Sequence, residues 1–121
     1  MWVFNFGWIF ISNFEAMKNR TEHITRLIKD TICQLDLNAE VILFGSRARG
    51  DEKPDSDWDI LILTTLPATI ETERKFRDKL YDLELDLEEP FSLFVYPKKE
   101  WKESKSATPF HMAVDKDGIL I

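Results

Sequence analysis

Two short apolar runs joined by a polar loop constrain the fold of this chain more than any other feature. Residues 40–44 read EVILF and residues 58–63 read WDILIL. Runs of this length and composition are typical of strands that are buried on both faces of a sheet. The loop between them contains Gly50 and Pro54, which interrupt regular structure. The sequence therefore predicts two buried strands connected by a loop over residues 45–56.

Helical patterns lie on both sides of this strand pair. Asn19, followed three residues later by Glu22, predicts the start of a helix that continues to Leu35. Thr69 predicts the cap of a second helix. Each helix carries an apolar stripe at helical spacing, formed by Ile24, Leu27, Ile28, Ile32 and Leu35 in the first and by Ile70, Phe76, Leu80, Leu83 and Leu87 in the second. We expect these stripes to pack on the sheet.

The second helix must end before Pro90, and a third apolar strand is predicted at residues 91–96. After Pro97 the sequence predicts only short elements, a helix at residues 109–114 and a last strand at residues 119–121. This order of elements, within the length of one domain, indicates an α/β or α+β fold. We expect a small mixed β-sheet with helices packed on it.

Composition narrows the function classes. The chain has 121 residues, of which 44% are hydrophobic and 31% charged, and its net charge is −6. An acidic surface repels phosphate backbones, so we expect no extended nucleic-acid surface. Cys33 is the only cysteine, which excludes an intramolecular disulfide and favours a cytoplasmic setting. His23 and His111 lack the spacing of a metal site, so solvated or core-edge roles are expected for them.

The first sixteen residues are unusual, because they hold six aromatic residues and no charge before Glu15. The apolar run is shorter than the roughly 20 residues of a membrane span and lacks the flanks of a signal peptide, so no membrane association is expected. Aromatic residues at every even position from Trp2 to Phe10 favour an added edge strand or a partner-docking surface. Alternatively, Met17 is the natural start and residues 1–16 are an upstream extension. In both cases residues 17–121 are expected to form the functional domain.

Two acidic residues stand where the second strand begins. Asp57 and Asp59 flank Trp58, and Gly45 with Ser46 directly follows the first strand. Because side chains alternate along a strand, both aspartates project to one face and the tryptophan to the other. Two carboxylates so close repel each other unless a cation lies between them, and Mg²⁺ takes oxygen ligands of this kind. The sequence therefore predicts a magnesium site at the start of this strand.

The loop supplies groups suited to phosphate. A glycine lets the backbone approach a ligand closely, and Ser46 adds a hydroxyl with neighbouring amides. Arg47 and Arg49 carry cations suited to phosphate oxygens, although one of them could instead pair with Asp51 or Asp55. We expect Arg47 in particular to face phosphate.

The string from Gly45 to Ile60 resembles the signature of the polymerase-beta nucleotidyltransferase superfamily. It is most similar to the minimal nucleotidyltransferase (MNT) domains, which have Gly-Ser, ten intervening residues and then Asp-x-Asp. The resemblance implies the polymerase-beta-like fold, an NTP such as ATP as substrate, and Mg²⁺. It implies nucleotide binding by Gly45, Ser46, Arg47 and Ser56, and catalytic metal ligation by Asp57 and Asp59. An acceptor hydroxyl would attack the α-phosphate in line and release pyrophosphate.

The sequence departs from the family at one position. The family places a third carboxylate on the next strand, and the matching residue here is Ser92. A serine is neither a comparable metal ligand nor a base at neutral pH. Glu88 and Glu89 are nearby, but they precede Pro90 and are expected to face solvent.

Two functions follow from this resemblance. In the first, the domain transfers a nucleotide, AMP from ATP, to a protein or small acceptor. In the second, it is a catalytically impaired nucleotide-binding or interaction module, because Ser92 replaces the third carboxylate. Minimal domains of this family resemble antitoxins that pair with a helical HEPN-type toxin, which implies a protein partner in either case.

Overall fold

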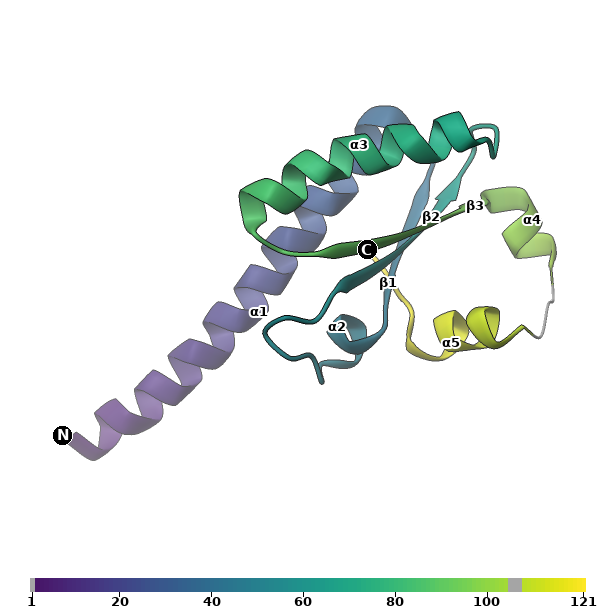
Figure 1. The fold of residues 1–121 in the computed structure, drawn as a ribbon. Helices are drawn as coiled ribbons and strands as arrows, with labels where there is room; N and C mark the ends of the chain where they lie inside the picture. Colours follow the sequence, from purple (N-terminus) through teal and green to yellow (C-terminus); the bar gives the residue numbers. More distant parts are fainter. Residues whose placement is uncertain (1, 105–107) are drawn as a thin grey trace.

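The computed structural model describes the backbone of residues 2–104 and 108–121, and the side chains of residues 15–104 and 108–121. A four-stranded sheet with the order β3-β2-β1-β4 forms its centre (Figure 1). Strand β1 is antiparallel to β2 and β4, and β2 is parallel to β3. The elements are α1 (Trp2–Leu35), β1 (Glu40–Phe44), α2 (Ser46–Arg49), β2 (Trp58–Thr64), α3 (Ile70–Leu87), β3 (Phe91–Pro97), α4 (Lys98–Glu103), α5 (Pro109–Asp117) and β4 (Ile119–Leu120). The expected α+β fold with a small mixed sheet is confirmed.

The main core lies between one face of the sheet and the helices α1 and α3, which pack against each other (Figure 1). It contains the predicted stripe of α1, the inward residues of the strands and the middle of α3. Its buried members are Ile24, Ile28, Ile32, Ala39, Val41, Leu43, Trp58, Ile60, Ile62, Phe76 and Leu80. Burial of this many apolar side chains is the main source of stability in a domain of this size.

A smaller core lies on the opposite face of the sheet, beneath α4 and α5. Its buried residues are Phe44, Leu61, Leu63 and Val114, with Ile42, Trp101 and Phe110 packed against them. Alternation along β2 separates the two cores, because even-numbered residues from Trp58 face α1 and α3 while Leu61 and Leu63 face α4 and α5. Asp57 and Asp59 have the parity of the second face, so the smaller core and the carboxylates share one side of the sheet.

The far end of β2 is fastened to the end of α1 by one buried carboxylate. Asp36 follows α1 and accepts hydrogen bonds from Thr64 Oγ1 at 2.7 Å, Thr65 N at 2.7 Å, Thr65 Oγ1 at 2.8 Å and Asn38 N at 3.1 Å. Burial raises the pKa of Asp36, but these four donors outweigh it and hold the pKa below its ordinary value of 3.8. We call this group the Asp36 clamp.

The expected strand at the amino terminus is wrong. Helix α1 begins at Trp2 and passes through Met17 and Asn19 without a break (Figure 1). A strand needs a neighbour for its backbone N–H and C=O groups, whereas a helix pairs them internally and gains one hydrogen bond for each residue added. The aromatic side chains of residues 2–14 lie outside the side chains described. The assignment of residues 17–121 as the functional domain stays a prediction.

Other boundaries follow local chemistry. The hydroxyl of Thr69 accepts a hydrogen bond from Thr72 N and caps α3, as predicted. Ile70, which was expected in the apolar stripe, is exposed, because the turn places Thr72 against the core instead. Helix α4 was not predicted, since its sequence is mostly charged and only Trp101 contacts the smaller core.

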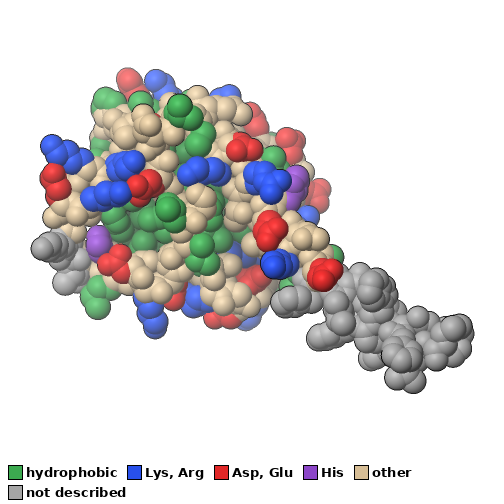
Figure 2. Space-filling model, turned by 180° about the vertical axis from the view of Figure 1, so that it is seen from behind, with side chains coloured by type: hydrophobic (Ala, Val, Ile, Leu, Met, Phe, Trp, Pro, Cys, Tyr) green, Lys and Arg blue, Asp and Glu red, His purple; other side chains and the backbone are tan. Residues whose placement is uncertain are grey.

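Charged side chains of both signs are interspersed on the face shown in Figure 2, with hydrophobic side chains gathered near its middle. Such mixing gives no single-sign electrostatic field on this face. Among the residues described, no helix has the length and apolarity needed to cross a membrane.

Candidate functional site

The two aspartates are placed by the strand β2. Asp59 pairs with Phe44 of β1 on one side and with Ser92 of β3 on the other. Asp57 lies two residues before it and projects to the same face. Its Oδ2 accepts a hydrogen bond of 2.9 Å from the hydroxyl of Ser92. The predicted pairing of Asp57 with Asp59, and the place of Ser92 beside them, are both confirmed.

Gly45 brings backbone against this pair. Its φ is +73°, a conformation that L side chains rarely adopt, and a Cβ atom here would collide with Oδ2 of Asp59. The requirement for glycine is therefore double, steric and conformational. Ser46 begins the single helical turn of α2 immediately afterwards.

Asp59 sits in an environment that opposes its charge. Burial raises its pKa above the ordinary 3.8, the neighbouring charge of Asp57 raises it further, and Arg49 partly offsets both. A bound cation would reverse the balance, because it would favour both ionised carboxylates. The two carboxylates would therefore be stabilised together by a bound cation.

Arg49 is the cation near the pair. It donates hydrogen bonds to Asp51 at 3.2 Å and, from α2 to α5, to Asp117 at 3.0 Å. The alternative that one arginine pairs with Asp51 is therefore correct for Arg49. The link to Asp117 was missed, because nothing local in the sequence connects residues so far apart.

Arg47 lies on the other face of the sheet. Its guanidinium carbon is 4.7 Å from the centre of the Trp58 ring, and it donates to the carbonyls of Ser56 and Pro54. Trp58 faces α1, away from Asp57 and Asp59, so the structure does not bring Arg47 to the carboxylates. Stacking on an aromatic ring and carbonyl contacts hold the guanidinium on that face, and a phosphate contact of Arg47 stays a prediction.

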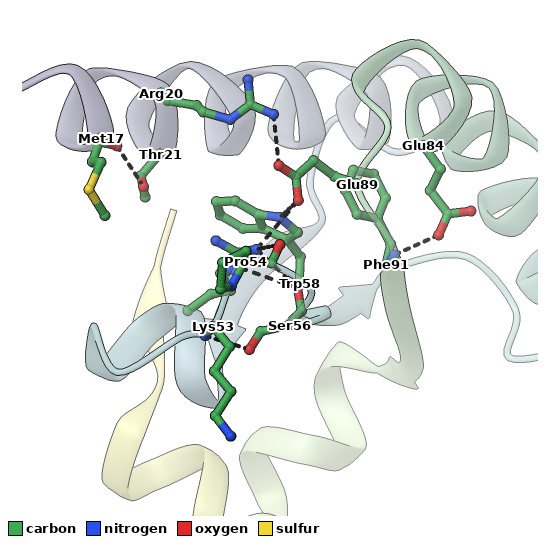
Figure 3. Close-up of polar contacts among 11 residues, drawn as sticks. Met17, Arg20, Thr21, Lys53, Pro54, Ser56, Trp58, Glu84, Glu89 and Phe91 are labelled. Atoms are coloured by element: carbon green, nitrogen blue, oxygen red, sulfur yellow. Dashed lines mark hydrogen bonds and ion pairs between the residues drawn. The ribbon is translucent and has the colours of Figure 1, made fainter. Parts of the chain in front are cut away.

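Glu89 lies in the same cluster as Trp58, on the face of the sheet away from the two aspartates (Figure 3). It accepts a hydrogen bond of 3.0 Å from Trp58 Nε1 and pairs with Arg20 of α1 at 2.7 Å and with Arg47 at 3.4 Å. Burial raises its pKa, but the contacts with Arg20, Trp58 and Arg47 lower it more. Glu89 was expected to face solvent; instead its side chain is only 10% exposed. Its partners bind it on the face away from the aspartates, so it does not replace the third carboxylate.

Ser56 organises the loop. Its hydroxyl accepts a hydrogen bond from Lys53 N at 2.9 Å, and its carbonyl accepts from Arg47. A cavity of about 340 Å³ opens beside this loop, lined by Met17, Arg20, Thr21, Arg47, Glu52, Lys53, Pro54, Trp58 and Glu89. None of these residues is one of the two aspartates or Ser92, so the cavity belongs to the Trp58 side. Of the predicted nucleotide-binding residues, Gly45 lies against Asp59, and Ser46 follows it at the start of α2.

The donor set fits a hard divalent cation. Within residues 15–104 and 108–121, no group of three or more His, Cys, Asp or Glu side chains is placed to share a metal. Two carboxylates remain, with the backbone of Gly45 close to Asp59. Mg²⁺ is commonly bound by one or two carboxylates together with substrate phosphates, whereas zinc sites use more nitrogen or sulfur ligands.

Comparison with known proteins agrees with this geometry. A solved crystal structure of a toxin–antitoxin with AMP-PNP has a similar fold, with a TM-score of 0.50 and 18% identity over 76% of this chain and 70% of that chain. At this identity the likeness shows the fold alone. No curated protein sequence matches the chain. The family described as nucleotidyltransferase domain matches residues 25–112, which include β1, the loop, β2 and β3. The chain therefore belongs to the nucleotidyltransferase domain family.

Proposed function

We propose that this nucleotidyltransferase domain transfers AMP from ATP to a hydroxyl group of a protein or small acceptor, with Mg²⁺ as the metal. The observation that carries the proposal is the placement of Asp57 and Asp59 on one face, against the backbone of Gly45. This arrangement brings like charges together at a place where a Cβ cannot fit. Such a place costs stability and is useful when a cation and an anionic ligand occupy it.

Each group of the site has a role in this proposal. Asp57 and Asp59 hold Mg²⁺, which when bound neutralises charge on the triphosphate. Gly45 leaves room for the phosphates, and Ser46 donates its hydroxyl and amide to their oxygens. Arg49 supplies long-range positive charge, because its guanidinium already acts on Asp59. We assign no phosphate contact to Arg47 or Ser56.

The transfer needs a base for the acceptor. A bond forms between the acceptor oxygen and the α-phosphorus, the bond to the bridging oxygen breaks, and pyrophosphate leaves with its electron pair. The proton of the acceptor hydroxyl must pass to a base or to water. On β3 the residue beside the pair is Ser92, whose hydroxyl donates to Asp57 rather than accepting a proton. We therefore expect slow transfer, with water as the proton acceptor.

Measurements of ATP binding and of labelling test the nucleotide site and the transferase activity separately. Calorimetric titration of ATP should show binding that requires Mg²⁺, and incubation with α-labelled ATP should label the protein or a co-expressed partner. Absence of metal-dependent NTP binding in the purified protein would overturn the nucleotide site itself. Binding without any labelling would overturn only the transferase activity.

A second candidate function is a nucleotide-binding module that has lost turnover. It is favoured by the Ser92–Asp57 hydrogen bond, which occupies the position where a base would stand. Ser92→Asp distinguishes the two. If the missing carboxylate limits an active enzyme, this variant should increase transfer by roughly 10²–10⁴-fold. Unchanged transfer, with ATP binding intact, would favour the binding module.

We further propose a protein partner of the HEPN type, as for antitoxins of this kind. Support comes from the similar fold of the toxin–antitoxin with AMP-PNP, and from the acidic net charge, which suits a basic partner surface. We place this pair in the cytoplasm, where ATP and Mg²⁺ are available. Co-expression with a helical HEPN-type protein should give a complex that survives size-exclusion chromatography. Separate elution of the two chains at micromolar concentration would contradict the pairing.

A further inference from the structure

A row of aromatic side chains leads away from the carboxylate pair on the same face of the sheet. Phe94 and Tyr96 follow Ser92 at steps of two residues along β3, so all three project to one side. Ring contacts extend the row to α4 and α5, with centroid distances of 5.1 Å from Phe94 to Phe110, 5.7 Å from Tyr96 to Phe110 and 5.3 Å from Tyr96 to Trp101. We call Phe94, Tyr96, Trp101 and Phe110 the aromatic platform.

The platform is continuous with the site. Phe44 pairs with Asp59 across β1 and β2, and its ring centroid lies 5.6 Å from that of Phe94. Tyr96 lies four residues after Ser92 along β3, a span of about 13 Å at the usual rise of a strand. An extended nucleoside triphosphate reaches a distance of this order from its terminal phosphate to its base.

The platform is also accessible. The side chains of Phe94 and Tyr96 are 36% and 41% exposed. Beyond them lies a cavity of about 380 Å³ whose walls include Tyr96, Trp101, Phe110 and His111. The His111 ring stacks on Trp101, with centroids 4.2 Å apart. A small apolar cavity of this volume with aromatic walls is typical of small-molecule sites.

We propose that the aromatic platform binds the nucleobase of the NTP, whose phosphates bind at Gly45, Asp57 and Asp59. The inference rests on the proposed nucleotide site. One NTP carries both chemistries that this face offers, an anionic chain for the cation site and a planar ring for the aromatic rings. The ribose joins them at a fixed separation. Rings that served packing alone would be covered, whereas Phe94 and Tyr96 keep exposed surface.

Stacking requires a ring but tolerates its identity, which suggests the substitutions. Leucine in place of Phe94 or Tyr96 keeps apolar bulk for the smaller core and removes the aromatic face. Tyr96→Phe keeps that face and removes only the hydroxyl. Tyr81→Leu is the matched control, because Tyr81 is an exposed tyrosine on α3, away from the platform.

Calorimetric titration with ATP and with inorganic tripolyphosphate, both with Mg²⁺, tests the proposal. Tripolyphosphate has the charge of the nucleotide but no base. Phe94→Leu and Tyr96→Leu should each weaken ATP binding by roughly 5- to 150-fold, the usual effect of losing one stacked base, and leave tripolyphosphate binding unchanged. Tyr96→Phe and Tyr81→Leu should bind both ligands like the parent protein.

Any other result of these titrations would contradict either the aromatic platform or the nucleotide site. ATP affinity within twofold of the parent value in both leucine variants would overturn the platform and leave the metal–triphosphate site standing. Equal losses for ATP and tripolyphosphate would also overturn it, since the platform cannot contact a ligand without a base. A parent protein that binds neither ligand would overturn the proposed function itself. Normal ATP binding with loss of partner binding would reassign the platform to a protein interface.

Discussion

The carboxylates at the two ends of β2 differ in how many hydrogen-bond donors they have. At its end, the Asp36 clamp gives one buried carboxylate four hydrogen-bond donors from Thr64, Thr65 and Asn38. At its start, Asp57 and Asp59 stand side by side, and among the residues described the only side-chain hydrogen bond to them comes from Ser92. A saturated carboxylate therefore lies against one end of β2 and an undersaturated pair lies at the other.

The difference separates structural from functional chemistry. A carboxylate whose lone pairs are all used inside the protein stabilises the fold and has nothing left for a ligand. A pair that repels itself destabilises the fold and gains most from an external cation. The pKa values move accordingly, downward for Asp36 and upward for Asp59. Substitutions at the two ends should therefore have opposite effects on stability and on binding.

The largest effect is expected for nucleotide binding at the start of the strand. Asp57→Asn should abolish Mg²⁺-dependent ATP binding, because an amide is a far weaker ligand and leaves one carboxylate for the metal. Calorimetry at saturating Mg²⁺ measures it. Normal affinity in this variant would remove Asp57 from the site, and Asp36→Asn serves as the control that should bind ATP normally while folded.

The next effect is on stability at the other end. Asp36→Asn should lower the free energy of unfolding by about 2–4 kcal/mol, since an amide cannot accept from all four donors and presents its own N–H groups to them. Urea denaturation followed by circular dichroism measures the change. A decrease in the free energy of unfolding of less than roughly 0.5 kcal/mol would show that water replaces the carboxylate at little cost.

The pH dependence of stability should differ in sign between the ends. The pKa of Asp36 is lowered, so its contribution is present above its unfolded value of 3.8 and is lost as the pH falls through the lower folded value. The pKa of Asp59 is raised, so its contribution is present below 3.8 and is lost as the pH rises through the higher folded value.

Unfolding free energies measured from about pH 2 to 7 test this pair of signs. Asp36→Asn should flatten the acid side of the curve. Asp59→Asn should remove a loss of stability that sets in above pH 3.8 in the parent protein. If both variants shift the curve in the same direction, the contrast between the two ends is wrong.

The smallest effect is a gain. At neutral pH and without metal, Asp59→Asn should raise the free energy of unfolding by about 1 kcal/mol or less, because it removes the repulsion with Asp57 and a partly buried charge. Thermal unfolding in the presence of a chelator measures it. A lower melting temperature would mean that Asp59 has a structural role not evident in its contacts.

Sequence patterns predicted those parts of the molecule whose chemistry is local. Strands β1, β2 and β3 follow from short apolar runs, and the start of α3 follows from its Thr69 cap. Alternation around Trp58 correctly placed Asp57 and Asp59 on one face, and register confirmed Ser92 beside them.

The misses share a different cause, which is tertiary contact. Arg47 and Glu89 are placed by contacts with Trp58 and with Arg20 of α1, which lie far from them in the sequence. The aromatic platform draws its members from β3, α4 and α5, and no spacing in the sequence joins Phe94 to Phe110. At the amino terminus the alternating pattern favours a strand, but the helical backbone needs no partner there.

The row formed by Phe44, Asp59 and Ser92 across three strands has a consequence for insertions. The loop over residues 45–56 contains none of these three residues, so changes in its length need not alter which strand residues lie opposite one another. A single residue inserted between Trp58 and Asp59 would instead put both side chains on the same face, so that either the carboxylate would face the main core or the indole would leave it. The spacing between Gly-Ser and Asp-x-Asp therefore only has to let the loop connect the two strands. The alternation of side chains within β2 decides whether both aspartates lie on the same face.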